Sequence, residues 1–288
     1  MNNKILILSL IPIISFSSLK CNLYNNINCK YTENLVSLKM DNDKLYRAYL
    51  FADKDNILIE DNVDASLPLA SLTKMMTAMV VLDNIDNLNI NVTVTKKASK
   101  IPYGVRLDQG DQYTVLELLK IMLIKSSNSA AQTLADYVCD TDFAQLMNNK
   151  AKEIGLKNTK YYTPHGLPPK YTNTKMDIST ARDIYKLSKY MMEHYPLLKE
   201  IVQIRNEEVA GFNLVNTNNL LLKMPNVKGI KTGFHNESKY NISVYYEENG
   251  REFYEIILGT QNVMQREVIT RAVIDDMKGV RWDLIYLK

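Results

Sequence analysis

Apolar and polar residues alternate along four short segments near the two ends of the chain. These segments span residues 47–52, 56–60, 241–247 and 252–258. Alternation with a period of two is typical of a strand with one buried face. Asp53-Lys54-Asp55 separates the first two segments, and Asn249-Gly250, the strongest short hairpin signal, separates the last two. We therefore predict an antiparallel hairpin near each end of the chain.

The long middle of the chain has the apolar spacing of helices. We predict helices over residues 72–82, 115–124, 129–138, 142–154, 179–194 and, after the last strand, 264–277. Thr114 and Glu117 have the spacing of a capping box at the start of the second helix, and Gly155 follows the end of the fourth. Strands on either side of a helical middle predict an α+β domain, with a helical subdomain and an antiparallel sheet built from both chain ends.

The N-terminus has the composition of an export signal. Lys4 precedes an almost wholly apolar run over residues 5–16, and small residues follow. This order predicts a signal peptide over residues 1–20 and an exported protein, periplasmic or on the outer face of the cytoplasmic membrane. Residues 21–43 are polar and Asn-rich, which predicts a tether. The alternatives are a core element, an uncleaved signal that acts as an N-terminal membrane tether, and lipidation of Cys21, although Lys20 stands where a small residue is expected.

Composition narrows the class of protein. The chain has 288 residues, of which 46% are hydrophobic and 23% charged, so it is long enough for one good-sized globular domain. We place that domain at residues 44–280 and a short tail at 281–288. The net charge of +3 gives no reason to expect nucleic acid as a partner. The three cysteines lack the spacing of a metal site, so we expect no metal and no cofactor.

Ser71-Leu72-Thr73-Lys74 is the first group of residues with chemical potential. A serine hydroxyl becomes a good nucleophile when a base accepts its proton. Serine at a helix start with lysine three residues later places both side chains on one face, about one turn apart. The alternative is Ser71 as a simple N-cap with Lys74 in solvent. The apolar residues that follow predict a buried helix and hence a partly buried amine, which favours the catalytic interpretation.

Two further groups lie later in the chain. Ser126-Ser127-Asn128 falls at the junction between two predicted helices, where Ser126 can relay a proton to a leaving amine and Asn128 can bond a substrate peptide. Lys231-Thr232-Gly233 falls at a predicted strand, where a lysine and a hydroxyl can hold a carboxylate and a glycine lets a substrate approach. An ordinary polar turn and a solvated strand end are the alternatives for each group alone.

Together the three groups are specific, because S-x-x-K, S-x-N and K-T-G are the motif set of penicillin-binding proteins and class A β-lactamases. Beyond these motifs, the chain resembles D-alanyl-D-alanine carboxypeptidases of the low-molecular-weight penicillin-binding protein type over about residues 45–277. The segments that carry the resemblance are residues 69–78, 150–159, 165–168, 180–183, 216–221 and 229–234. The resemblance implies a β-lactamase/transpeptidase-like fold.

The resemblance also implies a role for each catalytic group. Ser71 would form an acyl-enzyme with the penultimate D-Ala carbonyl of a peptidoglycan stem pentapeptide, and Lys74 would accept its proton. Ser126 would help to pass a proton to the departing D-Ala. The backbone N–H groups of Ser71 and Phe234 would stabilise the oxyanion. Penicillins and other β-lactam antibiotics would acylate the same serine.

Substrate binding is implied for the remaining motif residues. Asn128 would orient the donor peptide, Lys231 and Thr232 would bind the terminal carboxylate, and Gly233 with Phe234 would line the strand beside it. Two positions depart from the family pattern: His235 stands where many members have threonine, and Lys239 replaces a glycine. We expect His235 either to donate to a carboxylate or to be an exposed strand-edge residue, and Arg266 to add positive charge nearby. His165 and His194 are expected to be structural.

Three other functions share parts of this pattern. A class A β-lactamase needs a glutamate in E-x-x-L-N, and the run from Glu153 to Asn158 is out of register with it by one residue. An endopeptidase that cuts D-Ala cross-links uses the same machinery. A non-catalytic wall-binding module would lack Ser71 or Lys74, and both are present.

Overall fold

The computed structural model describes residues 45–139 and 141–277. The predicted signal peptide at 1–20, the tether at 21–43 and the tail at 281–288 lie outside the described residues. Within those ranges no helix has the length and apolar character needed to cross a membrane. The described residues also contain no cluster of three or more His, Cys, Asp or Glu side chains suited to a metal ion.

The central sheet has five antiparallel strands in the order β2-β1-β11-β10-β9. Their bounds are β1 Ala48–Asp53, β2 Ile57–Asp61, β9 Val227–His235, β10 Lys239–Glu248 and β11 Arg251–Thr260. The first and last parts of the chain meet at the centre of this sheet, where Ala48 pairs with Leu258. Asn249 and Gly250 both have positive φ, at 51° and 74°, as a type I′ hairpin turn requires. Both predicted hairpins and the sheet from both chain ends are therefore confirmed.

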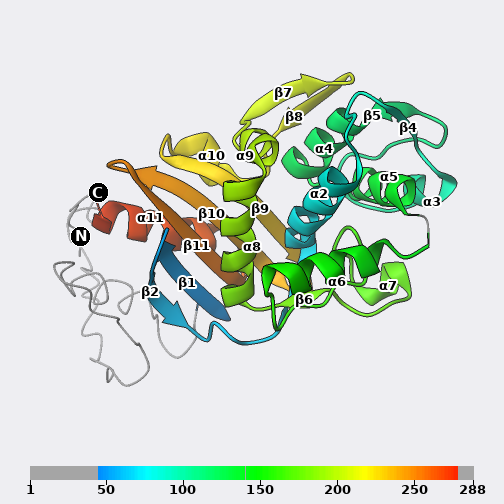
Figure 1. The fold of residues 1–288 in the computed structure, drawn as a ribbon. Coiled ribbons are helices and arrows are strands. Elements are labelled where there is room, and N and C mark those ends of the chain that lie inside the picture. Colours follow the sequence, from blue (N-terminus) through cyan, green and yellow to red (C-terminus); the bar gives the residue numbers. More distant parts are fainter. Residues whose placement is uncertain (1–44, 140, 278–288) are drawn as a thin grey trace, which may run out of the picture.

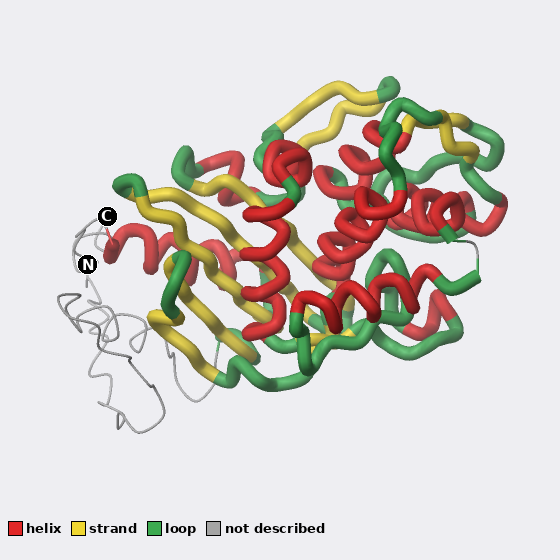
Figure 2. The backbone as a smooth tube through the Cα atoms, in the orientation of Figure 1, coloured by secondary structure: helices red, strands yellow, loops and turns green. Residues whose placement is uncertain are grey.

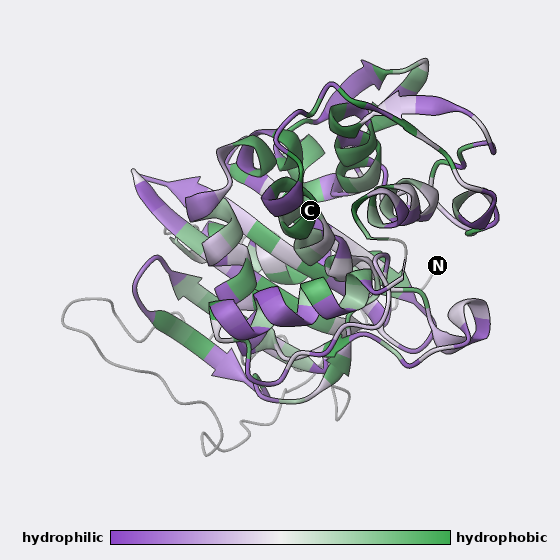
Figure 3. Cartoon of the chain, turned by 45° about the vertical axis from the view of Figure 1, so that its right-hand side comes forward, coloured by the Kyte–Doolittle hydropathy of each residue, from purple (hydrophilic) through white to green (hydrophobic). Residues whose placement is uncertain are grey.

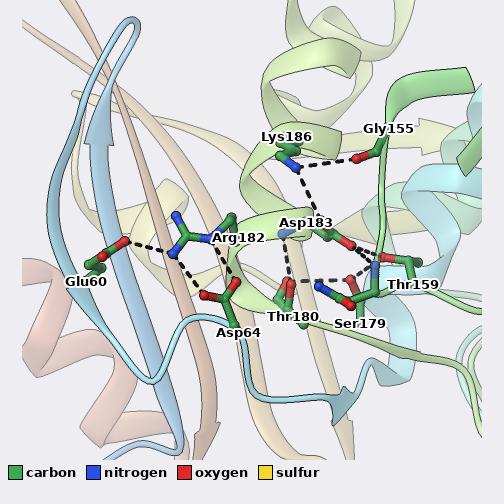
Figure 4. A network of polar contacts seen from close by, with 10 residues as sticks. Glu60, Asp64, Gly155, Thr159, Ser179, Thr180, Arg182, Asp183 and Lys186 are labelled. Atoms are coloured by element: carbon green, nitrogen blue, oxygen red, sulfur yellow. Dashed lines mark hydrogen bonds and ion pairs between the residues drawn. The ribbon is translucent and has the colours of Figure 1, made fainter. Parts of the chain in front are cut away.

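Each face of the sheet is covered by a helix (Figure 1). Alternate residues of β1 point to opposite faces, so Leu50 packs in the core beside α8 (Ala181–His194), while Tyr49 and Phe51 pack beside α11 (Val263–Met277). Arg182, in the first turn of α8, forms ion pairs with Asp64 and with Glu60 of β2, as Figure 4 shows. This network joins the start of α8 to the edge of the sheet.

The other helices form a subdomain beside the sheet, seen as the red group at the right of Figure 2. Its main members are α2 Thr73–Asn84, α4 Val115–Ile124, α5 Asn128–Val138 and α6 Phe143–Ile154. Hydrophobic positions concentrate in the central helices and hydrophilic ones toward the outside (Figure 3). The helix α2 is buried along most of its length, from Thr73 to Val81, as its strongly apolar, Met-rich sequence predicted.

Short elements complete the fold. They are the 3₁₀ turn η1 Ala70–Leu72, α3 Lys96–Ser99, α7 Pro169–Thr172, α9 Pro196–Val202, α10 Asn219–Lys223, and the strand pairs β3 Leu67–Pro68 with β6 Ile178–Ser179, β4 Asn91–Thr93 with β5 Gln112–Thr114, and β7 Asn206–Val209 with β8 Phe212–Val215. The predicted helix over 179–194 starts two residues later than expected because Ser179 pairs with Leu67 in the β3–β6 ladder. The predicted capping box at Thr114 and Glu117 and the left-handed helix end at Gly155 are both confirmed.

Candidate active site

Ser71 and Lys74 lie at the point where the 3₁₀ turn η1 passes into α2. The Lys74 amine is fully buried and lies 2.8 Å from Ser71 Oγ, 2.6 Å from Asn128 Oδ1 and 2.8 Å from the His165 carbonyl oxygen. Two of these three neighbours are carbonyl oxygens, which can only accept, whereas the serine hydroxyl can donate. A neutral Lys74 would therefore donate to the two carbonyls and accept from Ser71, which is the geometry of a base.

The environment of Lys74 favours that neutral form. Burial lowers the pKa of Lys74 well below its ordinary value, the positive charge of Lys231 lowers it further, and the Asp177 carboxylate raises it. The sequence predicted a partly buried amine. The structure buries the amine completely, because it enters the space between α2, the start of α5 and the segment around His165.

Lys231 and Ser126 form the second half of the site. Lys231 Nζ donates to Ser126 Oγ over 2.9 Å and to the Thr232 carbonyl over 3.0 Å. Burial, followed by the charge of Arg266, lowers the pKa of Lys231 to about 7. Ser126 has a positive φ of 60° at the corner between α4 and α5, and this tight corner turns its hydroxyl toward Lys231. The structure thus brings the S-x-N and K-T-G motifs into contact.

Asn128 opens α5 one residue after the N-cap Ser127. Its Oδ1 accepts from Lys74, and its Nδ2 donates to the Pro102 carbonyl over 2.7 Å. The side chain is buried, so its amide connects Lys74 to the segment before α5. Nearby, the Tyr103 carbonyl accepts from Asn128 N, and the Tyr103 ring packs edge-on against Tyr171 of α7.

Strand β9 passes directly beside Ser71. A Cβ atom on Gly233 would lie 2.9 Å from the Leu69 carbonyl oxygen and 3.1 Å from Ser71 N, so this close approach requires glycine. Phe234, the next residue, is 50% exposed and stacks on Tyr240 with ring centroids 4.2 Å apart. Thr232 is buried, and its hydroxyl lies 2.8 Å from that of Thr217.

The expectations for His235 need correction. Its side chain is only 8% exposed, so the interpretation as an exposed strand-edge residue is wrong. His235 Nδ1 accepts from Ser238 N over 3.0 Å, and it also lies 3.0 Å from Glu237 Oε2, so the ring is held within the β9–β10 turn. Lys239, which replaces a family glycine, has a φ of 59°, a backbone conformation that favours glycine.

Arg266 lies on α11 and is buried beneath the sheet, where it donates to the Asn241 carbonyl over 3.0 Å. Its positive charge acts on the site, because it lowers the pKa of Lys231. Asn241 is a residue that the sequence analysis missed. Its Nδ2 donates to the carbonyls of Pro68 and Leu69 over 2.9 and 3.1 Å, which fixes the chain just before Ser71 to the sheet.

The segment around His165 holds Lys74 through its backbone. The His165 ring is buried and accepts from Leu167 N, whereas its carbonyl oxygen accepts from Lys74. Gly166 packs against the turn η1 that carries Ser71, since a Cβ atom on Gly166 would lie 1.9 Å from the Ala70 carbonyl oxygen. No motif marked this contact, because it joins backbone atoms of two segments that are far apart in the sequence.

Glu153 does not support the β-lactamase alternative. Its side chain is 60% exposed near the end of α6 and forms an ion pair with Lys150 over 2.9 Å. It therefore faces solvent, whereas the Lys74 amine is fully buried.

Comparison with known proteins places this geometry in a family. The sequence profile described as D-alanyl-D-alanine carboxypeptidase (Peptidase_S11) matches residues 47–262. The chain is 29% identical over 234 residues to "D-alanyl-D-alanine carboxypeptidase DacF" of Bacillus subtilis (strain 168), covering 77% of this chain and 59% of that protein. It is 36% identical over 197 residues to a "D-alanyl-D-alanine endopeptidase" of Pseudomonas aeruginosa, covering 63% of this chain and 60% of that protein.

A solved structure confirms the expected fold class. The ampicillin-bound form of penicillin-binding protein D2 from Listeria monocytogenes superposes with a TM-score of 0.71 at 28% identity, covering 82% of this chain and 98% of that one. The described chain thus has the fold of penicillin-binding proteins. It spans about 60% of the length of the two curated relatives that it matches.

Proposed function

Because this chain belongs to the D-alanyl-D-alanine carboxypeptidase family, we propose that it is a serine peptidase that removes the terminal D-Ala from peptidoglycan stem pentapeptides through an acyl-enzyme. The observation that carries the proposal is the position of Lys74 Nζ, 2.8 Å from Ser71 Oγ, with both of its other contacts on carbonyl oxygens. An amine held in this way, with a lowered pKa, is suited to accept the hydroxyl proton.

Acylation begins when Ser71 Oγ attacks the carbonyl carbon of the penultimate D-Ala and Lys74 takes the hydroxyl proton. The negative charge on the former carbonyl oxygen is stabilised by the backbone N–H groups of Ser71 and Phe234, which belong to the two segments in contact at Gly233. The amide bond then breaks, and a proton from Lys74 reaches the departing amine through Ser126. In the second step water attacks the ester carbonyl, its oxygen becomes part of the new carboxylate of the shortened peptide, and a proton from this water restores the hydroxyl of Ser71.

Binding of the substrate's terminal carboxylate is the proposed role of Lys231 and Thr232. Lys231 donates to Ser126 and keeps its positive charge when the pH is below about 7. Gly233 lets β9 pass close to Leu69 and Ser71, which places the edge of β9 that faces away from β10 beside the substrate. Asn128 is proposed to orient the donor peptide, next to Lys74, from which its Oδ1 accepts a hydrogen bond. We place this activity outside the cytoplasm, on an exported protein with an N-terminal membrane tether as an option.

The experiment is covalent labelling with a fluorescent penicillin, followed by intact-mass measurement. β-Lactams are proposed to acylate Ser71, so the wild type gains the mass of one antibiotic and Ser71→Ala gains none. Ser127→Ala is a matched control, because Ser127 caps α5 close to the site and is assigned no chemical step. Absence of labelling in the wild type, or labelling of Ser71→Ala, would overturn the proposal.

A second candidate, cleavage of D-Ala cross-links, is favoured by the 36% identity to a protein named as an endopeptidase. The two activities share every catalytic residue and the same acyl acceptor, water, and differ in the leaving amine that the site admits: a free D-Ala or the cross-linked partner peptide. Incubation with a stem pentapeptide and, separately, with a cross-linked dimer distinguishes them. Free D-Ala from the pentapeptide supports the carboxypeptidase, and conversion of the dimer alone supports the endopeptidase.

A further inference from the structure

Asp177 is a buried carboxylate behind the active-site helix, in a position that no motif indicated. Its Oδ1 accepts from the backbone N–H groups of Tyr162 and Thr163 over 2.6 and 3.0 Å. Its Oδ2 accepts from the hydroxyls of Thr163 and Thr73 over 2.7 and 3.1 Å. Thr73 is the residue immediately before Lys74, so one carboxylate joins the start of α2 to the segment 162–166.

The directions of these hydrogen bonds show that the carboxylate is built to be ionised. Backbone N–H groups can only donate. The Thr163 hydroxyl oxygen already accepts from Gly166 N over 2.8 Å, which leaves its hydrogen for Asp177. At least three donors therefore converge on the two oxygens, and a protonated acid would have to turn its hydrogen toward a donor.

The same bonds fix the backbone that contacts Lys74. Asp177 holds Tyr162 and Thr163, and the Pro164 carbonyl accepts from Thr77 of α2 over 2.6 Å. The next carbonyl along the chain, that of His165, is the one that accepts from Lys74 Nζ. The carboxylate thus determines where this acceptor lies relative to the amine.

Asp177 also acts on Lys74 through its charge. The negative charge of Asp177 raises the pKa of Lys74, against burial and the charge of Lys231, which lower it. The other titratable groups around it are Tyr161 and His165 of the same segment and Asp183 of α8, which with Asp177 raises the pKa of Tyr161. Burial raises the pKa of Asp177 to about 6, so the group still carries its charge at neutral pH.

We propose that Asp177 is a positioning residue that sets the proton affinity of Lys74, by holding the His165 carbonyl against the amine and by supplying a buried negative charge beside it. The inference rests on the proposed function, because the proton affinity of Lys74 affects the reaction only if Ser71 is the nucleophile. Asp177 thus supplies a negative charge behind α2, in addition to the contacts that Ser71, Lys74 and Asn128 of the motifs make with one another.

The test is the pH profile of the second-order rate constant for acylation by a penicillin, measured on the whole chain for wild type, Asp177→Asn and Asp183→Asn. Asp183 is a matched control: it is equally buried and accepts from the same stretch of chain four residues earlier, from Asn158 N and from Thr159 Oγ1, the latter labelled in Figure 4. In Asp177→Asn the loss of charge lowers the proton affinity of Lys74. The acidic limb of the profile is expected to move to lower pH by about one unit, and the plateau to fall about threefold to tenfold because the base is weaker.

In Asp183→Asn the acidic limb is expected to stay at the wild-type pH. A wild type that labels normally, together with an Asp177→Asn profile that loses amplitude without moving, would overturn the role of Asp177 and leave the proposed function intact. Absence of labelling in the wild type would instead overturn the proposed function.

If Asp177→Asn does not fold, Thr73→Val is the second variant, since it removes one donor to the carboxylate and keeps the backbone bonds. Asp177 then takes up its proton at a higher pH, so the acidic limb moves in the same direction by a smaller amount. An unmoved limb in that variant would also overturn the proposal.

Discussion

Asn128→Asp is a near-isosteric change that places a carboxylate against the amine of Lys74. Asn128 Oδ1 lies 2.6 Å from Lys74 Nζ, and both side chains are buried. Two unit charges about 4 Å apart attract by about 4 kcal/mol at an effective dielectric constant of about 20. One pKa unit corresponds to about 1.4 kcal/mol, so the attraction is equivalent to about three units. The second carboxylate oxygen faces the Pro102 carbonyl, which opposes the ionised form, so we take one to three units as the range.

The raised pKa shifts Lys74 toward its protonated form, which cannot accept the proton of Ser71. The second-order rate constant for penicillin acylation at pH 7 is therefore expected to fall by about 10-fold to 1000-fold, and to recover as the pH is raised. Stopped-flow fluorescence or timed intact-mass measurement between pH 6 and 10 gives this constant directly. Asn128→Ala is the control, because it removes the acceptor without adding charge, and its loss of rate should not recover at high pH. Wild-type rates at every pH in Asn128→Asp would refute Lys74 as the base.

The remaining predictions concern carboxylate binding, packing and stability. Burial lowers the pKa of Lys231 to about 7, so its positive charge is present below that pH and lost above it. KM for a pentapeptide should therefore rise from pH 6 to 8.5. A constant KM over this range would contradict the role of Lys231 in binding the terminal carboxylate. Gly166 and Gly155 have similar φ values of 84° and 79°, but a Cβ atom on Gly166 would lie 1.9 Å from the Ala70 carbonyl oxygen, whereas one on Gly155 meets open space. Gly155→Ala should therefore lower the free energy of unfolding only by the backbone strain, about 1–2 kcal/mol. Gly166→Ala should lower the midpoint of unfolding much further than Gly155→Ala does. Equal midpoints in the two variants would show the close contact at Gly166 to be unimportant. Burial raises the pKa of Glu255 from 4.5 to about 7, so between these pH values the folded state holds a proton that the unfolded state has released. The free energy of unfolding should therefore fall by about 3 kcal/mol from pH 4.5 to 7.5. Chemical denaturation of Glu255→Gln should show that this part of the pH dependence is lost.

The strands and long helices could be predicted because each buries one face or its whole surface, which leaves a period in the sequence. The hairpin turn at Asn249-Gly250 and the helix end at Gly155 follow from backbone conformations that few residues adopt. Ser71, Lys74 and Lys231 could be predicted as well, since each lies in a short motif whose members are neighbours in the chain.

The rest of the site depends on contacts between distant segments, which leave no local pattern. Thr73 and Asp177 are 104 positions apart, and Asn241 reaches Pro68 across 173 positions. The burial of His235 depends on the return of the chain through Ser238, which a strand pattern does not encode. The short β3–β6 pair also left no local pattern, because two-residue strands are too short to show a period.

The pairing of β1 with β11 determines when the site can come into being during folding. Tyr49 of β1 bonds Glu255 of β11 across 206 positions, and the Lys231–Ser126 bond closes a loop of 105. Contacts of such long range form slowly, because the entropy of closing the loop is lost before the contact is gained. A chain still lacking β9 to β11 would contain Ser71, Lys74 and Ser126. It would lack Lys231, which donates to Ser126, and the strand β9, which passes beside Ser71. On the proposed function, Ser71 would become competent only when the last strands dock, so acylation by a penicillin would report completion of the whole fold.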